Sequence, residues 1–345
     1  MVAMVCSGGR RCARAQSSRG IVAGDPGTVK SVLPALTSSA ALCDSHPPMQ
    51  AQVAEGTISR CFIPVAFLLC TVIWGSTFLV IRLGNDVTPP LWAATLRLAM
   101  AAIFLGGVMV LTGQRLPRGD ELRVTLLYGL LVFGVNFTLL YYSETRISSG
   151  ITAVIYATLP LTTLAFARWL GIEEFTFRKL AGGVVGLLGV VVIFLGDMSA
   201  ETAPLYLLMA FMGSVSAALS SAILKRGPHA PVVTTNAVAS AVGAVVCGAA
   251  SVLAGEEHAL PHTWAAWLPL LYLTFAGSVV AFVAYTWLLK RWSATRASFT
   301  SILVPVLAII LGAAVRHEHF TRGALIGALL VLTGLAIALT APRRA

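Results

Sequence analysis

The sequence predicts an all-α integral membrane protein with ten transmembrane helices, arranged as two five-helix repeats of inverted topology. Three observations lead to this fold class. Of the 345 residues, 57% are apolar and only 11% are charged. The apolar residues form ten long stretches, and the second half of the chain repeats features of the first half at a shift of 145 residues. Together these observations place most of the chain in a lipid bilayer.

The composition excludes a water-soluble fold. Soluble globular proteins carry about 25% charged residues, and 24 basic with 14 acidic side chains cannot coat a soluble domain of this length. A net charge of +10 would indicate nucleic-acid binding only if the basic residues clustered on one face, but they lie at the ends of apolar stretches. The six cysteines form no CxxC motif and no cluster with histidine. We therefore expect no metal, no cofactor and no nucleic-acid partner.

Each apolar stretch is close to the roughly 20 residues that a helix needs to cross a bilayer core. Because lipid offers the backbone no hydrogen-bond partner, segments this long and apolar must be helices. Charged residues, Gly or Pro bound each segment. The ten predicted spans are 62–81, 90–112, 124–142, 150–168, 179–196, 204–224, 231–254, 267–289, 295–315 and 322–341.

Residues 1–60 differ in composition from the rest of the chain. They are rich in Ala, Ser, Gly and Arg, and they show no sustained apolar period. We expect a disordered tail here, with Met49 as an alternative start of the chain. A targeting segment is the other interpretation, although the tail lacks both an apolar signal core and an amphipathic stripe.

The basic residues predict the orientation in the membrane, since cytoplasmic loops carry an excess of Lys and Arg. With the tail left out, the connections on one side and the C-terminus hold 13 of them, and the loops on the other side hold four. We therefore expect a multi-pass protein of the inner or plasma membrane with both termini in the cytoplasm. Its expected surroundings are the lipid bilayer, and the sequence also allows a homodimer.

An internal repeat explains the number of spans. The shift of 145 residues gives seven identities in the 17 positions from 173 to 189, and it also aligns Pro160 with Pro305. The predicted repeats are residues 62–196 and 204–341. An odd number of helices in each repeat inverts the second repeat in the membrane, an architecture found in many secondary transporters. The seven aligned pairs are Glu173 with Glu318, Phe175 with Phe320, Thr176 with Thr321, Leu180 with Leu325, Gly182 with Gly327, Leu187 with Leu332 and Gly189 with Gly334.

Two motifs resemble a known family. The first span reads Trp74-Gly75-Ser76-Thr77-Phe78, and each half ends with Glu-x-Phe-Thr followed by glycines, starting at Glu173 and at Glu318. The chain thereby resembles the EamA-type transporters of the drug/metabolite transporter superfamily over residues 62–341. This resemblance implies a ten-helix carrier, and it leaves the substrate open among amino acids, other metabolites and drugs. The chain departs from the family pattern at Glu174, where relatives often have a basic residue.

The shared motif predicts structural roles. Thr176 and Thr321 stand where a helix N-cap is needed, and the preceding carboxylate would face the positive end of a helix dipole. A gating role for the carboxylate stays open. Gly182 and Gly334, with the other glycines nearby, would let helix backbones approach closely in lipid.

Arg97 is the one charged residue in the interior of a predicted span, since the others lie at span ends, in loops or in the tail. It lies seven residues after Pro90, about 10 Å along a helix with a rise of 1.5 Å per residue. Two interpretations stay open: a structural arginine that snorkels or forms an ion pair, and a residue that lines the outer half of a polar cavity. We expect Glu144 to be its partner.

Neutral polar residues and helix-breaking prolines mark a polar path near the middle of the membrane. Each proline removes a backbone hydrogen bond, so a neighbour or a cavity must satisfy the freed carbonyl. Trp74 belongs to this set because it lies deep in a span, whereas the other predicted membrane tryptophans lie nearer the helix ends. Besides Trp74, Arg97 and Glu144, the predicted pathway residues are Asn136, Tyr156, Thr158, Pro160, Ser214, Ser278, Tyr285, Ser301 and Pro305.

We expect a secondary transporter that moves a small organic metabolite by alternating access. An enzyme is disfavoured because no His, Asp, Glu or Cys residues converge at one membrane depth. The resemblance implies that relatives exporting cationic drugs use a Glu in the first span, and residues 62–81 contain no acid, which disfavours antiport of cationic drugs. Two alternatives stay open: an exchanger of organic anions or sugar phosphates, and a membrane receptor or scaffold that transports nothing.

Overall fold

The structure is a computed structural model that describes residues 49–147, 149–194, 204–307 and 322–340. Every regular element in these ranges is helical, and the described residues form one compact unit. Residues 1–48, which the sequence predicts to be disordered, lie outside the part of the chain that the structure describes. The helices are α1 (Met49–Asn85), α2 (Pro90–Leu111), α3 (Asp120–Gly129), η1 (Leu130–Val135), α4 (Asn136–Ser143), α5 (Ser149–Tyr156), α6 (Leu159–Trp169), α7 (Phe177–Phe194), α8 (Pro204–Arg226), α9 (Val232–Leu253), α10 (Trp264–Tyr272), η2 (Leu273–Val280), α11 (Ala281–Arg291), α12 (Ala294–Ser298) and α14 (Arg322–Leu339).

Each of the ten predicted spans contains a helix in the described residues. Several spans are composite: α3, η1 and α4 follow one another without a break, as do α10, η2 and α11. Seven helical segments are long and apolar enough to cross a membrane, and Ala294–Leu307 and Leu329–Leu339 are shorter apolar helices. The all-helical membrane class is thus confirmed for the described ranges. The count of ten spans and the inverted topology stay predictions.

The first helix begins earlier than the sequence predicts. Helix α1 starts at Met49, so residues 49–60 are helical and do not belong to the disordered tail assigned to residues 1–60. This short stretch contains Met, Gln, Ala and Glu, which favour helices. Adding turns to an existing helix avoids the unfavourable nucleation step. The tail prediction is therefore wrong for these residues.

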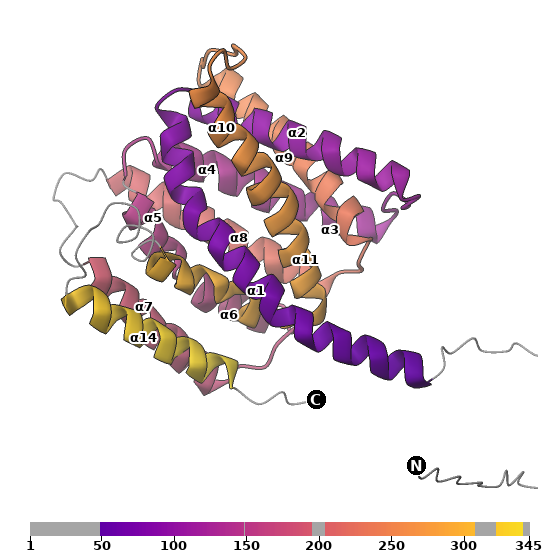
Figure 1. Ribbon diagram of the computed structural model, residues 1–345, viewed down its shortest axis with the longest axis vertical. Helices are drawn as coiled ribbons and strands as arrows, with labels where there is room; N and C mark the ends of the chain where they lie inside the picture. Colours follow the sequence, from indigo (N-terminus) through magenta and orange to yellow (C-terminus); the bar gives the residue numbers. More distant parts are fainter. Residues whose placement is uncertain (1–48, 148, 195–203, 308–321, 341–345) are drawn as a thin grey trace, which may run out of the picture. The chain divides into compact units, whose positions relative to one another are not determined.

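Helix α2, which carries Arg97, is held at its start by a carboxylate from the other half of the chain. Pro90 occupies the first helical position, where its missing N–H costs no hydrogen bond. Glu256, in the loop after α9, accepts hydrogen bonds from the backbone N–H groups of Leu91 at 3.1 Å and Trp92 at 2.8 Å. Helices α2 and α9 also pack against each other (Figure 1). These contacts position Arg97 relative to the second half.

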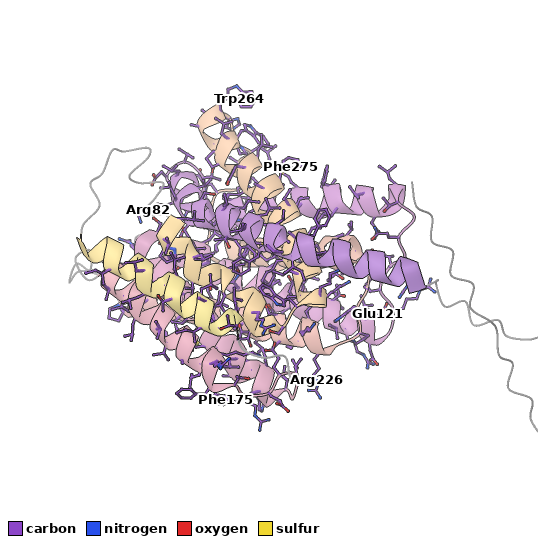
Figure 2. All side chains as sticks on the ribbon, turned by 60° about the horizontal axis from the view of Figure 1, so that its bottom comes forward. Arg82, Glu121, Phe175, Arg226, Trp264 and Phe275 are labelled. Atoms are coloured by element: carbon purple, nitrogen blue, oxygen red, sulfur yellow. The ribbon has the colours of Figure 1, made fainter. Side chains whose placement is uncertain are left out.

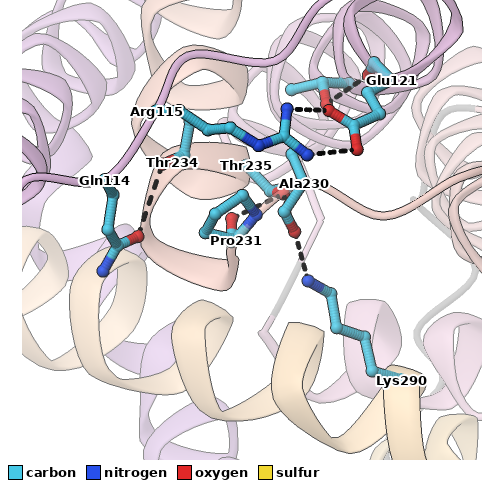
Figure 3. A network of polar contacts seen from close by, with 9 residues as sticks. Gln114, Arg115, Glu121, Ala230, Pro231, Thr234, Thr235 and Lys290 are labelled. Carbon is cyan, nitrogen blue, oxygen red and sulfur yellow. Dashed lines mark hydrogen bonds and ion pairs between the residues drawn. The ribbon is translucent and has the colours of Figure 1, made fainter. Parts of the chain in front are cut away.

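A network of polar contacts lies at the C-terminal end of α2 and the N-terminal end of α9 (Figure 3). Arg115 forms an ion pair with Glu121 at 2.6 Å, and Lys290 at the end of α11 donates a hydrogen bond to the carbonyl of Ala230. The Thr234 hydroxyl donates to Gln114 at 3.4 Å. Both halves therefore contribute to this network.

The shared Glu-x-Phe-Thr motif makes structural contacts in the first half. Glu173 pairs with Lys179 in the first turn of α7 at 2.6 Å, and it accepts the backbone N–H of Thr295 in α12 at 3.1 Å. Burial alone would raise the pKa of the Glu173 carboxyl, but the bonds from Lys179 and Thr295 outweigh burial and lower it. Glu173 is therefore an ionised link between the halves. The equivalent residues Glu318 and Thr321 lie outside the described residues.

Helices α7 and α14 pack closely through glycines, as the sequence predicts (Figure 1). A Cβ atom added to Gly182 would lie 2.5 Å from the carbonyl oxygen of Gly334, and one added to Gly334 would lie 2.5 Å from that of Gly182. Gly189 approaches Gly327 in the same way. Such close backbone contact supplies the van der Waals attraction that holds helices together in lipid.

We predict that Gly182→Ala lowers thermal stability, because the added methyl group forces α7 and α14 apart. Overpacking of this kind costs about 1–3 kcal/mol. The matched control is Gly106→Ala in α2, where nothing lies within 4 Å of the added Cβ and the alanine should favour the helix slightly. The two variants are purified in detergent and heated, and the fraction of protein that remains monodisperse gives the melting temperature of each. Equal melting temperatures would contradict this account of the packing.

Candidate functional site

A cavity of about 90 Å³ lies among helices from both halves of the chain. From the first half, α1, α2, η1, α4, α5 and α6 contribute to its wall, and from the second half, α8, α11, α12 and residues 300–304 do so. The lining residues are Trp74, Thr77, Phe78, Arg97, Val132, Asn136, Phe137, Leu140, Tyr156, Leu159, Ala217, Ser221, Phe282, Tyr285, Ser298, Thr300, Ser301 and Val304.

The structure brings half of the predicted pathway residues to this cavity. Six line it, namely Trp74, Arg97, Asn136, Tyr156, Tyr285 and Ser301. The other six, Glu144, Thr158, Pro160, Ser214, Ser278 and Pro305, are not among its lining residues. Residues that lie far apart in the sequence therefore share one space, and their role in transport stays a prediction.

Arg97 is buried, with 1% of its surface exposed, and its guanidinium is held by neutral groups. Its Nε atom donates to the Ser278 hydroxyl at 2.8 Å, and its Nη1 atom donates to the Tyr141 hydroxyl at 3.0 Å. The Cζ atom lies 4.7 Å from the centre of the Phe137 ring, within the range of a cation–π interaction. These contacts favour a fixed arginine in the bundle interior over one that snorkels to the surface.

The expected pair of Arg97 with Glu144 is not among the ion pairs of the described residues. Glu144 follows the end of α4 and is buried, with 1% exposed, and the positive charge that acts on it is Arg82. Burial raises the pKa of its carboxyl well above the usual value, against the lowering effects of Arg82 and the Thr152 hydroxyl. The prediction was wrong because sequence position gives a depth in the membrane and leaves the direction of each side chain open.

Two π-helical segments lie beside the cavity. A shift of 145 residues carries η1 onto 275–280, which is part of η2, so both segments occupy related places in the two halves. Val132 of η1 lines the cavity, and Ser278 of η2 accepts the hydrogen bond from Arg97. A Cβ atom at Gly277 would lie 2.7 Å from the Nη2 atom of Arg97, so this glycine makes room for the guanidinium. Such irregular segments are frequent at functional sites.

The polar part of the wall is uncharged apart from Arg97. Tyr156 donates a hydrogen bond to the side-chain oxygen of Asn136 at 2.5 Å, and the amide of Asn136 donates to the Val132 carbonyl at 3.0 Å. The hydroxyls of Ser221 and Tyr285 lie 3.2 Å apart. Behind the wall, Thr158 contacts Ser214 at 3.4 Å, which explains the place of these two predicted residues.

The two aligned prolines act on residues that line the cavity. A proline removes the hydrogen bond to the carbonyl four residues earlier. For Pro160 that carbonyl belongs to Tyr156, and for Pro305 it belongs to Ser301. Tyr156 and Ser301 both line the cavity and are equivalent under the repeat. Pro305 lies inside the helix Ala294–Leu307 and leaves the Ser301 carbonyl without its helical donor, whereas Pro160 stands in the first turn of α6, after α5 has ended at Tyr156.

The aromatic part of the site was only partly found from the sequence. Trp74 contacts Phe282 and Tyr285, with ring centroids 5.3 and 5.0 Å apart. Phe282, Phe137 and Tyr141 were not among the residues predicted from the sequence. A signal was present for the last two, because Phe133, Phe137 and Tyr141 recur every four residues and form one helix face.

The EamA-like transporter family matches residues 62–195 and 204–340. The chain belongs to this family. The Escherichia coli K12 protein named "Uncharacterized inner membrane transporter YedA" is 33% identical over 254 residues, covering 73% of this chain and 82% of that protein. A Salmonella typhimurium protein named "Probable amino-acid metabolite efflux pump" is 27% identical over 285 residues, covering 78% of this chain and 92% of that one.

A solved crystal structure gives the same fold as this EamA-like chain. Its TM-score is 0.68 at 20% identity, covering 80% of this chain and 96% of that one. At this identity the likeness shows the fold alone. The family and the names of its relatives indicate a transporter, and no group of three metal-binding side chains occurs in the residues described for this EamA-like chain.

We predict that Tyr156→Phe destabilises this EamA-like protein, because the buried Asn136 oxygen loses the hydrogen bond it accepts. The expected cost is about 1–3 kcal/mol. The control is Tyr272→Phe, whose hydroxyl lies 2.6 Å from Ser76 in an exposed place, where Ser76 keeps its bond to the Ile73 carbonyl. Thermal unfolding in detergent measures both variants. If Tyr156→Phe and Tyr272→Phe lost the same thermal stability, the hydrogen bond between Tyr156 and Asn136 would contribute no more than an exposed one.

Proposed function

We propose that this chain is a secondary transporter that moves a small organic metabolite across the inner membrane by alternating access. Amino acids and other small organic metabolites of similar size are the candidate substrates. The observation that carries the proposal is the cavity, whose wall comes from both halves of the chain. The name of the E. coli relative supports a location in the inner membrane, and the name of the S. typhimurium relative supports a small organic metabolite as the substrate.

Contacts between the halves occur at both ends of the cavity-bearing helices, as alternating access requires. At one end, Glu256 of the second half binds the start of α2. At the other, Glu173 of the first half binds the start of α12. In the proposed ten-helix, inverted arrangement, the first contact lies outside and the second lies inside. Rocking of the halves would open one end while the contacts at the other end persist.

A receptor or scaffold role fits these observations less well. Such a role needs no internal space, whereas here a buried arginine and a set of neutral polar groups surround a cavity. The EamA-like family is named for transporters. The exchange of anions remains compatible with the site because of Arg97.

We predict that filling the cavity abolishes function. Ala217→Trp places a large ring at a position that lines the cavity, whereas Val245→Trp places the same ring on an exposed part of α9. Metabolite profiles of cells with and without the gene should differ, and the difference should disappear with Ala217→Trp and persist with Val245→Trp. Matched membrane abundance of the variants is the control. A difference that persists with Ala217→Trp would overturn the role of the cavity.

We predict that both termini and the loop at 227–231 face the cytoplasm, whereas the loop at 254–263 faces outward. Figure 2 labels Trp264 and Arg82 in the upper half of the view and Glu121, Arg226 and Phe175 in the lower half, in keeping with opposite membrane sides. His229→Cys and Glu257→Cys, both at exposed positions, are made in a background without the six native cysteines. A membrane-impermeant maleimide should label only position 257 in intact cells. Labelling of position 229 alone would reverse the orientation.

A further inference from the structure

The cavity contains one cation, and no acidic residue is among those that line it. Arginine stays protonated in proteins. Within the described part of the chain Arg97 forms no ion pair, and its hydrogen-bond partners are the neutral hydroxyls of Ser278 and Tyr141. A buried charge without a counter-ion is unfavourable, and charged residues inside membrane bundles mark ligand or ion pathways. The electrostatics of the cavity therefore favour an anionic ligand.

The guanidinium has the donors that such a ligand needs. Of its five N–H donors, the Ser278 and Tyr141 bonds use two, so three remain. A carboxylate takes two donors in a bidentate pair. Both N–H groups of Nη2 are among these three, because Ser278 accepts from Nε and Tyr141 accepts from Nη1. One carboxylate can thus bind Arg97 while Ser278 and Tyr141 keep its orientation.

Beside its neutral polar groups, the wall offers an apolar surface that suits a short aliphatic chain. Aromatic rings surround the space, among them Trp74, Phe78 and Phe282, together with aliphatic side chains. The cavity volume of about 90 Å³ is smaller than the roughly 150 Å³ of an apolar cavity that binds benzene. No carboxylate stands in the wall to bind an ammonium group. These features favour a small anion over a zwitterion or an amine.

We propose that the cavity binds a short-chain monocarboxylate, with the carboxylate on Arg97 and the aliphatic chain among the aromatic rings. This inference rests on the proposed role of the cavity as the transport site, and it names the substrate class. Tyr141 and Ser278 are positioning residues, because they act on the ligand through the guanidinium.

Four small probes of similar size separate the chemistries at pH 7. Propionate carries only the carboxylate, propionamide is neutral, propylamine carries only the ammonium, and L-alanine carries both charges. Isothermal titration calorimetry on the purified full-length protein measures each one. Propionate should bind at least about tenfold more tightly than propionamide. A hydrogen bond to a charged group contributes about this much to the affinity. Propylamine should not bind, and L-alanine should bind less tightly than propionate.

Variants test the assignment to Arg97. Arg97→Lys should weaken propionate binding about tenfold although the charge is kept, because lysine lacks the planar fork. Tyr141→Phe should weaken it by a smaller factor of about threefold, and should leave the weak binding of propionamide unchanged. Tyr272→Phe, outside the cavity, should bind propionate as the wild type does. If Arg97→Lys does not fold, Tyr141→Phe decides the question.

Three results would overturn the inference: no binding of propionate, equal binding of propionamide, or tighter binding of L-alanine than of propionate. Unchanged propionate affinity in both Arg97→Lys and Tyr141→Phe would do the same. These failures differ from failure of the proposed function. Loss of the metabolite difference in Ala217→Trp together with no propionate binding would retain the transporter and reject this substrate class. A metabolite difference that persists in Ala217→Trp would reject the transport role of the cavity.

Discussion

The burial of one guanidinium group is the constraint on which the centre of this protein depends. Arg97 enters the bundle from α2, and a charge at this position must be solvated by protein groups because lipid cannot solvate it. Tyr141 and the Phe137 ring of α4, together with Ser278 of η2, supply that environment. Gly277 supplies the room. The irregular helical turn in η2 brings Ser278 and Gly277 to the same guanidinium.

Two kinds of packing surround this centre. At α7 and α14 the backbones nearly touch, because glycines remove the side chains that would separate them. Around the cavity, larger side chains line the wall, among them the aromatic rings of Trp74 and Phe282. The first kind makes a firm contact between equivalent helices of the two halves. The second kind leaves a space that a solute can occupy, and ionised Glu173 links the halves beside it.

Much of the fold could be predicted from the sequence because membrane helices are specified by long apolar stretches. The positions of the helices and the close glycine contacts followed from composition and spacing. The start of α1 did not, because a polar stretch with good helix formers can extend a helix beyond the apolar part. At the site, Trp74, Asn136 and Tyr285 were predicted from the sequence, because each is a polar or unusual residue near the middle of a span, and all three line the cavity. Phe282 and Tyr141 were missed, because an aromatic residue in an apolar helix looks like ordinary packing.

By itself, the sequence determined the class of the protein, the approximate limits of its helices, its family and the one charge inside a span. These properties depend on composition, local order and depth, all of which can be counted along the chain. Only the tertiary structure decided which groups face Arg97. Glu144 lies at a plausible depth but forms no ion pair with Arg97 in the described residues, whereas Ser278, 181 residues from Arg97 in the sequence, binds the guanidinium. The physical reason is rotational: depth follows from residue number, but the face that a side chain presents depends on how each helix packs against its neighbours.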